Sequence, residues 1–262
     1  MNIWVMSDLH LEYRDYKLDP AGFCPPHASV LVLAGDVGNG VEAVEWMNRQ
    51  QERIGLPIIF VPGNHDFFDY DGTDMFELLE QMKAAANPCV HILYNERIEV
   101  SGVRFLGTTL WTDYRYSDPP GKSERELMLS TSLYPDYFTI HLGGEKFTPE
   151  DSVRLHHEAR DWLESELLGL RDRDKKPRVV VTHFLPSPRS LDPRFKGKDT
   201  SAAFCSELPD ALLGLADVWL HGHSHYAQDW RGPGGVHVVC NPMGYSDDGE
   251  APGFDPVKWV TV

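Results

Sequence analysis

Five short segments of the sequence carry aspartate, asparagine and histidine side chains at close spacing. The segments are Ser7-Asp8-Leu9-His10, Gly35-Asp36, Gly63-Asn64-His65-Asp66, Thr182-His183 and His221-Gly222-His223-Ser224-His225. Carboxylate and imidazole ligands without thiolates suit Zn, Fe, Ni or Mn, and suit Ca or Mg less well. Any one segment alone is more simply explained as a polar turn or a helix cap. Five of them in one chain predict a shared metal-binding site.

Each of these segments directly follows a short apolar run of strand length. The runs cover residues 3–6, 30–34, 58–61, 179–181 and 218–220. Continuous apolar runs of this kind are typical of strands that are buried on both faces. Because ligands of open α/β sheets bind just beyond the carboxyl ends of the strands, the five polar segments are expected at one rim.

The remaining pattern predicts one α/β domain over residues 1–262. Helical spacing of apolar residues predicts helices at 40–53, 73–86 and 148–170, with Thr148 as the N-cap of the last. Further strands are predicted at 90–93, 97–100, 103–106, 236–239 and 258–262.

Two stretches interrupt the alternation of strands and helices. Residues 112–147 are rich in Tyr, Pro, Gly and charged residues, which predicts a cap inserted into the domain. Residues 186–200 are predicted as a long loop in which basic residues outnumber acidic ones. These charges could hold a phosphate, because the loop follows His183 directly. A merely solvated loop is the favoured interpretation.

The order and spacing of the five polar segments resemble the signature of the calcineurin-like metallophosphoesterase family. The match runs from Asp8 to His225 and covers most of the chain. The resemblance implies an α/β fold of the α+β type, in which two mixed β-sheets form a sandwich flanked by helices. It also implies a dinuclear metal site at the strand ends.

The resemblance further implies a role for each polar residue. The first metal ion would be bound by Asp8, His10, Asp36 and His225. The second would be bound by Asp36, Asn64, His183 and His223. His65 would be the catalytic histidine, which contacts the substrate phosphate and binds no metal. The expected cofactors are two divalent or trivalent ions drawn from Mn, Fe, Zn and Ni.

The reaction expected of such a site is hydrolysis of a small phosphomonoester or phosphodiester. Two cations about 3.5–4 Å apart clamp the attacking and leaving oxygens of an in-line displacement. A metal-bound hydroxide is the natural nucleophile, because metal binding lowers the pKa of water to roughly 7. Asp36 can bridge two ions because a carboxylate has two oxygens, and the neutral amide of Asn64 limits the negative charge.

One position departs from the family pattern. Many members have an aspartate three positions after the bridging aspartate, where it orients the catalytic histidine, and here that position is Asn39. Asp66 is next to His65, but neighbouring side chains often point apart. Without a carboxylate partner and beside two cations, His65 is expected to have a lowered pKa and to be a weak general acid.

Composition limits the partners of the chain. The formal net charge of the 262 residues is −16, which disfavours a nucleic-acid polymer, because such a partner needs clustered Lys and Arg. The four cysteines are scattered, and no apolar run is long enough to span a membrane. We therefore expect a cytoplasmic protein with a small phosphorylated substrate and no membrane partner, and the oligomeric state stays open.

Three other functions fit parts of the pattern. A catalytically silent scaffold of the same fold would bind a protein partner, but such scaffolds tend to lose metal ligands, and the set is complete here. A nuclease of the same fold is disfavoured by the acidic charge. A hydrolase of the metallo-β-lactamase type needs an Asp-His soon after its His-x-His, and here Tyr226-Ala227 follow His225, which excludes it.

Overall fold

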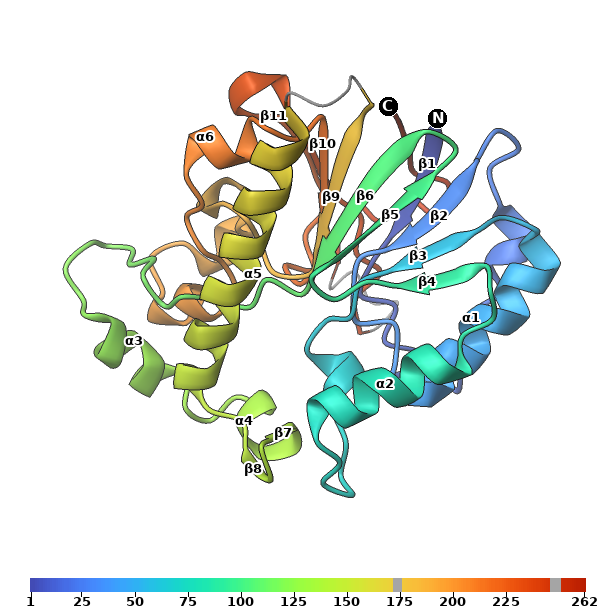
Figure 1. The fold of residues 1–262 in the computed structure, drawn as a ribbon. Coiled ribbons are helices and arrows are strands. Elements are labelled where there is room, and N and C mark those ends of the chain that lie inside the picture. Colours follow the sequence, from blue (N-terminus) through green and yellow to red (C-terminus); the bar gives the residue numbers. More distant parts are fainter. Residues whose placement is uncertain (172–175, 246–250) are drawn as a thin grey trace.

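Two β-sheets pack face to face, and helices cover the outer face of each (Figure 1). The structure is a computed structural model that describes residues 1–171, 176–245 and 251–262. Both sheets contain parallel and antiparallel pairs. The fold predicted from the sequence, a sandwich of two mixed sheets flanked by helices, is therefore confirmed.

The first sheet has the strand order β13-β1-β2-β3-β4. Its strands are β1 (Asn2–Met6), β2 (Val30–Leu33), β3 (Ile58–Phe60), β4 (Val90–Ile92) and β13 (Trp259–Thr261). The strands β1 to β4 pair in parallel, and β13 pairs antiparallel with β1. Helices α1 (Gly40–Ile54) and α2 (Met75–Ala85) cover the outer face of this sheet (Figure 1).

The second sheet has the strand order β11-β12-β10-β9-β6-β5. Its strands are β5 (Glu96–Val100), β6 (Val103–Thr108), β9 (Arg178–Thr182), β10 (Val218–His221), β11 (Gln228–Arg231) and β12 (His237–Cys240). The inner strands are parallel, and the edge strands β5 and β11 are antiparallel to their neighbours. Helices α5 (Pro149–Arg171) and α6 (Asp210–Leu213) cover its outer face (Figure 1).

The strands are apolar on both faces because each face is buried against a different layer. In β1, Ile3 and Val5 belong to the core between the two sheets, whereas Trp4 and Met6 pack with the helices. Alternate residues of one strand point to opposite faces of its sheet. This double burial accounts for the continuous apolar runs in the sequence.

The predicted start of the long helix α5 is confirmed. The N–H of Asp151 donates to Thr148 Oγ1 at 3.1 Å, and the Asp151 carboxylate accepts the N–H of Thr148 at 3.1 Å, so each residue satisfies the other. Helix α2 begins slightly later than predicted, because Asp74 is its N-cap and accepts the N–H of Phe76 at 2.9 Å. No helix among the described residues is long and apolar enough to cross a membrane.

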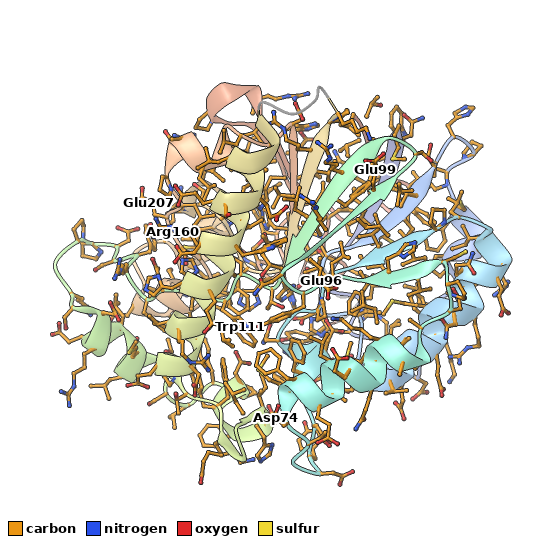
Figure 2. The ribbon with its side chains drawn as sticks, viewed as in Figure 1. Asp74, Glu96, Glu99, Trp111, Arg160 and Glu207 are labelled. Carbon is orange, nitrogen blue, oxygen red and sulfur yellow. The ribbon has the colours of Figure 1, made fainter. Side chains whose placement is uncertain are left out.

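Residues 112–147, hereafter the 112–147 segment, lie outside the two sheets. They form α3 (Glu124–Ser130), α4 (Asp136–Thr139) and the short hairpin of β7 (His141–Leu142) and β8 (Glu145–Lys146) (Figure 1). The hairpin contacts the start of α2, where the Asp74 carboxylate accepts the N–H of Gly143 at 2.6 Å (Figure 2). Buried Trp111 lies between α5 and α2 and packs on Phe147 with ring centroids 4.7 Å apart (Figure 2).

Candidate metal centre

The loops at the carboxyl ends of β1, β2 and β10 hold one another in place. The N–H groups of Asp8 and His10 donate to the carbonyls of Gly35 and Asp36 at 2.9 and 3.0 Å. The N–H of His223 donates to Asp8 Oδ1 at 2.9 Å. These contacts bring polar segments from separate strands to one edge of the sandwich, as expected from the sequence.

The backbone of these loops adopts a conformation that non-glycine residues rarely take. Positive φ angles occur at Asp8 (52°), His10 (44°), Asp36 (53°), His223 (68°) and His225 (44°). Such backbone costs of the order of 1–3 kcal/mol per residue and persists only where the surroundings over-determine it. All five residues are candidate ligands, so this part of the backbone strain lies where side-chain direction matters most.

The structure brings the candidate ligands together in two groups, and a third group joins His65 to His10 and Asp36. The ligand atoms of the first group lie within 4.8 Å of one another and belong to Asp8, His10 and His225. Those of the second group lie equally close and belong to Asp36, His183 and His223.

Asp36 and Asn64 complete the arrangement. Asp36 Oδ2 lies 3.9 Å from His10 Nε2 and 3.2 Å from His183 Nε2, so one carboxylate oxygen stands between the two groups. Asn64 Oδ1 lies 3.1 Å from His183 Nε2 and adds an amide oxygen to the second group. The structure thus places the residues of both implied ligand sets beside one another, and their assignment to two ions stays a prediction.

The donor atoms themselves fit bound cations. Asp8 Oδ2 is buried and has no hydrogen-bond partner among the described residues. The Nε2 atoms of His10 and His225 face each other at 3.1 Å. A Cβ atom added at Gly63 would come within 2.2 Å of Asp36 Oδ1, so only glycine permits this close approach of backbone to the carboxylate.

Outer hydrogen bonds determine which histidine nitrogen faces the centre. His183 Nδ1 lies 3.0 Å from the carbonyl oxygen of Ala34, and His10 Nδ1 lies 3.1 Å from the Glu12 carboxylate. Because these oxygens only accept, we assign the ring proton to Nδ1 in both residues. The Nε2 lone pair is then free to bind a cation, as is usual for histidine ligands.

Charges inside the cluster strongly influence one another. Burial opposes ionisation of Asp36, but His183 and His65 outweigh it and hold the pKa of Asp36 well below its usual range. Burial likewise favours neutral His183, but the Asp36 carboxylate raises the pKa of His183 to about 9. Burial lowers the pKa of His223 to about 3. A cation must therefore displace a proton from His183, whereas His223 is already neutral.

Asp66 organises the surrounding loops and does not face the ring of His65. Its carboxylate accepts four backbone hydrogen bonds, at 2.7, 2.7, 3.0 and 3.1 Å, from the N–H groups of Gly63, Asp36, Val37 and Gly38. Burial and the nearby Asp36 carboxylate raise the pKa of Asp66 to about 7, although the N–H groups favour its ionised form. Asp66 thus ties the loop after β3 to the loop after β2.

His65 has a carboxylate neighbour that sequence reasoning missed. Glu12 Oε1 lies 3.5 Å from His65 Nδ1, which is an ion-pair distance but longer than a normal hydrogen bond. Burial favours neutral His65, but Asp36 and Glu12 outweigh it and raise the pKa of His65. The expectation that His65 lacks a carboxylate partner is therefore wrong, whereas the lowering of its pKa beside two bound cations stays a prediction.

Asn39 has a different role from the one expected of its position. Its side-chain amide donates to the backbone carbonyls of His65 and Phe68 at 3.2 and 3.3 Å, so it supports the turn that carries His65. The far side of the ring is covered by Tyr245, whose hydroxyl lies 3.1 Å from His65 Nε2. Tyr245 is 180 residues from His65, and the sequence carries no signal that places it there. The only signal for Glu12 is that it is two residues from His10.

A pocket of about 490 Å³ opens beside the candidate ligands. The 112–147 segment contributes Tyr134 and Asp136 to its lining, and the 186–200 loop contributes Arg194, Phe195 and Lys198. Arg194 and Lys198 are exposed and also line the cavity next to the cluster, so their holding of a phosphate stays a prediction.

Comparison with known proteins agrees with this geometry. A family model described as calcineurin-like phosphoesterase matches residues 1–227. The chain is 25% identical over 284 residues to protein L509 of Acanthamoeba polyphaga mimivirus, covering 98% of this chain and 95% of that protein.

Solved structures share the fold. Phosphopantetheinyl hydrolase from Mycobacterium tuberculosis matches with a TM-score of 0.72 and 20% identity, over 99% of this chain and 95% of that one. A dimetal phosphatase from Danio rerio matches with a TM-score of 0.54 and 12% identity, over 94% and 88% of the two chains. Because the family model covers most of the sequence, the chain belongs to the calcineurin-like phosphoesterase family.

Proposed function

We propose that the chain hydrolyses phosphoester bonds of a small molecule at a centre of two metal ions. The observation that carries this proposal is the position of Asp36 Oδ2, which lies between His10 Nε2 and His183 Nε2. One oxygen placed between two groups of ligand atoms is the arrangement that a pair of bridged cations requires. Family membership supports phosphoester hydrolysis as the reaction class.

The residues of this chain supply distinct parts of the chemistry. The ligands of the first ion would be Asp8, His10, Asp36 and His225, and those of the second would be Asp36, Asn64, His183 and His223. Two bound cations would activate water and neutralise charge on the phosphate. His65 lies beside His10 and Asp36, where its ring can donate to a phosphate oxygen or protonate the leaving oxygen.

The pocket supports a substrate with an apolar portion. Phe204 packs between Phe195 and Tyr134, with ring centroids 5.3 and 6.1 Å away, and these rings form an aromatic wall. Lys198 Nζ lies 4.9 Å from the centroid of the Phe195 ring and can contact an anionic group of the same molecule. We infer that the ester carries an aliphatic or aromatic group that packs on this wall.

Metal analysis and turnover of three esters test the proposal. The esters are an aryl phosphomonoester, a bis-aryl phosphodiester and a phosphopantetheinyl ester, the last because of the fold shared with the Mycobacterium tuberculosis hydrolase. We expect two metal ions per chain and hydrolysis of at least one ester. Asp36→Ala should lose both ions and nearly all activity, whereas Asp229→Ala, at the surface, should keep both.

Two outcomes would contradict the proposal. Active protein with one ion or none would exclude the dinuclear centre. Protein that holds two ions and hydrolyses none of the three esters would favour the scaffold function instead. The nuclease alternative would require turnover of a nucleic-acid polymer in preference to all three.

A further inference from the structure

The 112–147 segment reaches the candidate metal centre through one side chain. Asn64 Nδ2 donates to Asp136 Oδ1 at 2.9 Å, and Asp136 belongs to α4, 72 positions further along the chain. On its other side, Asn64 Oδ1 lies 3.1 Å from His183 Nε2, in the second group of ligand atoms. The two ends of one amide therefore face two different parts of the molecule.

This contact determines which end of the Asn64 amide faces the second metal site. The oxygen and nitrogen ends of an asparagine amide have nearly the same shape, but only the oxygen can bind a cation. An ionised carboxylate only accepts hydrogen bonds, so Asp136 pairs with the nitrogen end and directs the oxygen end towards His183. A reversed amide would direct two N–H donors at the cation.

The position of Asp136 is itself well supported. The next residue, Tyr137, has its ring stacked with that of Phe147 at a centroid distance of 6.1 Å, and its hydroxyl contacts the hydroxyl of Tyr114. Phe147 packs in turn on buried Trp111. Helix α4 is thus anchored on the core through Tyr137, Phe147 and Trp111.

We propose that Asp136 is a positioning residue for the second metal ion, which it affects by orienting the amide of Asn64. This inference rests on the proposed two-metal function. It also couples the 112–147 segment to the metal centre, because any displacement of α4 removes the acceptor that orients the amide. Asp136 lines the pocket as well, so the residue that orients Asn64 also borders the space beside the candidate ligands.

The test compares metal affinities of three variants in the full-length protein. We expect Asp136→Ala to weaken binding of the second ion by about tenfold or more, which is usual when the outer partner of a ligand is removed, and to leave the first ion unchanged. Asp136→Asn retains a carbonyl acceptor and should lose less. Phe138→Ala is the matched control, because Phe138 lies on α4 with its side chain 54% exposed. Calorimetric titration of metal-free protein, prepared with a chelator, with Mn²⁺ measures the affinities of the first and second metal sites.

A double-mutant cycle separates positioning from a general loss of structure. If Asp136 acts by orienting Asn64, Asp136→Ala should have no further effect on metal affinity in the Asn64→Ala background. Additive losses, or Asp136→Ala protein with unchanged affinity at both sites, would overturn the inference. The measured quantity is metal affinity, so the test does not depend on turnover. Wild-type protein that binds fewer than two ions refutes the proposed function itself. Asp136→Ala protein with wild-type metal affinity refutes only the positioning role.

Discussion

The carboxylate of Glu12 contacts the rings of both His10 and His65. Its Oε1 is 3.1 Å from the Nδ1 atom of His10 and 3.5 Å from that of His65. His10 is a candidate ligand of the first ion, and His65 is the candidate catalytic histidine. One carboxylate therefore orients a metal ligand and stabilises the protonated form of the neighbouring acid.

Glu12→Gln should reduce the ability of His65 to act as a general acid. The change removes the negative charge that helps to raise the pKa of His65, so its protonated form is lost at lower pH. Hydrolysis of alkyl esters, which need a protonated leaving oxygen, should fall by about tenfold or more, and aryl esters should lose less. The measurement is a pH–rate profile on a matched aryl and alkyl pair, and profiles that superimpose on wild type would rule out this role.

Asn39→Asp should leave the pH–rate profile close to that of wild type. Its side chain donates to the carbonyls of His65 and Phe68, so the substitution changes the turn and leaves the ring's neighbour Glu12 in place. Two carbonyls would lose a donor and face a carboxylate, which should cost about 1–3 kcal/mol of stability. Denaturant unfolding measures that loss. A pH–rate profile on alkyl esters that is shifted to higher pH, together with an unchanged free energy of unfolding, would contradict this account.

At the scale of elements, Asp66 connects two loops that follow neighbouring strands. It belongs to the loop after β3 and accepts N–H groups of three consecutive residues in the loop after β2, beginning with Asp36. The position of the candidate bridging carboxylate, Asp36, thus depends on Asp66, which is not among the candidate ligands. Asp66 therefore holds the loop that carries Asp36 against the loop after β3.

Asp66→Ala should destabilise the protein by about 3 kcal/mol or more, because several buried N–H groups lose their acceptor together. The same variant should lose bound metal, since the loop carrying Asp36 is released. Denaturant unfolding and elemental analysis measure the two effects. Asp229→Ala is the control, because it removes exposed contacts with Lys258 and His237 that are worth at most about 1 kcal/mol each. Equal losses in both variants would show that Asp66 has no special role.

At the scale of the whole molecule, protonation of the buried centre links stability to pH. The pKa of His183 is raised from 6.5 to about 9. The stability that protonated His183 contributes is therefore fully present below pH 6.5 and is lost as pH rises through 9. The pKa of Asp66 is raised from 3.8 to about 7, so its contribution is lost as pH rises through 7. His221 and His223 have lowered pKa values and affect stability only below pH 6.5.

The melting temperatures of metal-free protein, prepared with a chelator, and of metal-loaded protein should therefore change with pH in opposite directions. Between pH 6.5 and 9 the melting temperature of the metal-free protein should fall, because His183 loses its proton while Asp36 stays ionised. In loaded protein the ions bind deprotonated His183, so rising pH tightens binding and adds stability. Melting curves of both forms at the two pH values provide the test. Parallel changes in the two forms would show that His183 does not release a proton to the ions.

The sequence by itself determined the described strands of the two sheets except β11, and the edge at which the polar residues meet. Runs such as residues 30–34 are apolar throughout because both faces of their strands are buried, and the residue after such a run must lie at the sheet rim. Asp8, Asp36 and His183 could be placed in this way, since their position follows from local pattern and strand direction.

Only the tertiary structure decided how these residues are supported. Glu12 reaches His65, and Asp136 reaches Asn64, because the backbone turns at left-handed positions such as His10 and because α4 is anchored on distant core residues. Neither direction is encoded in spacing along the chain. Side-chain partners across loops depend on how whole elements pack, and sequence periodicity reports burial but not direction within a loop.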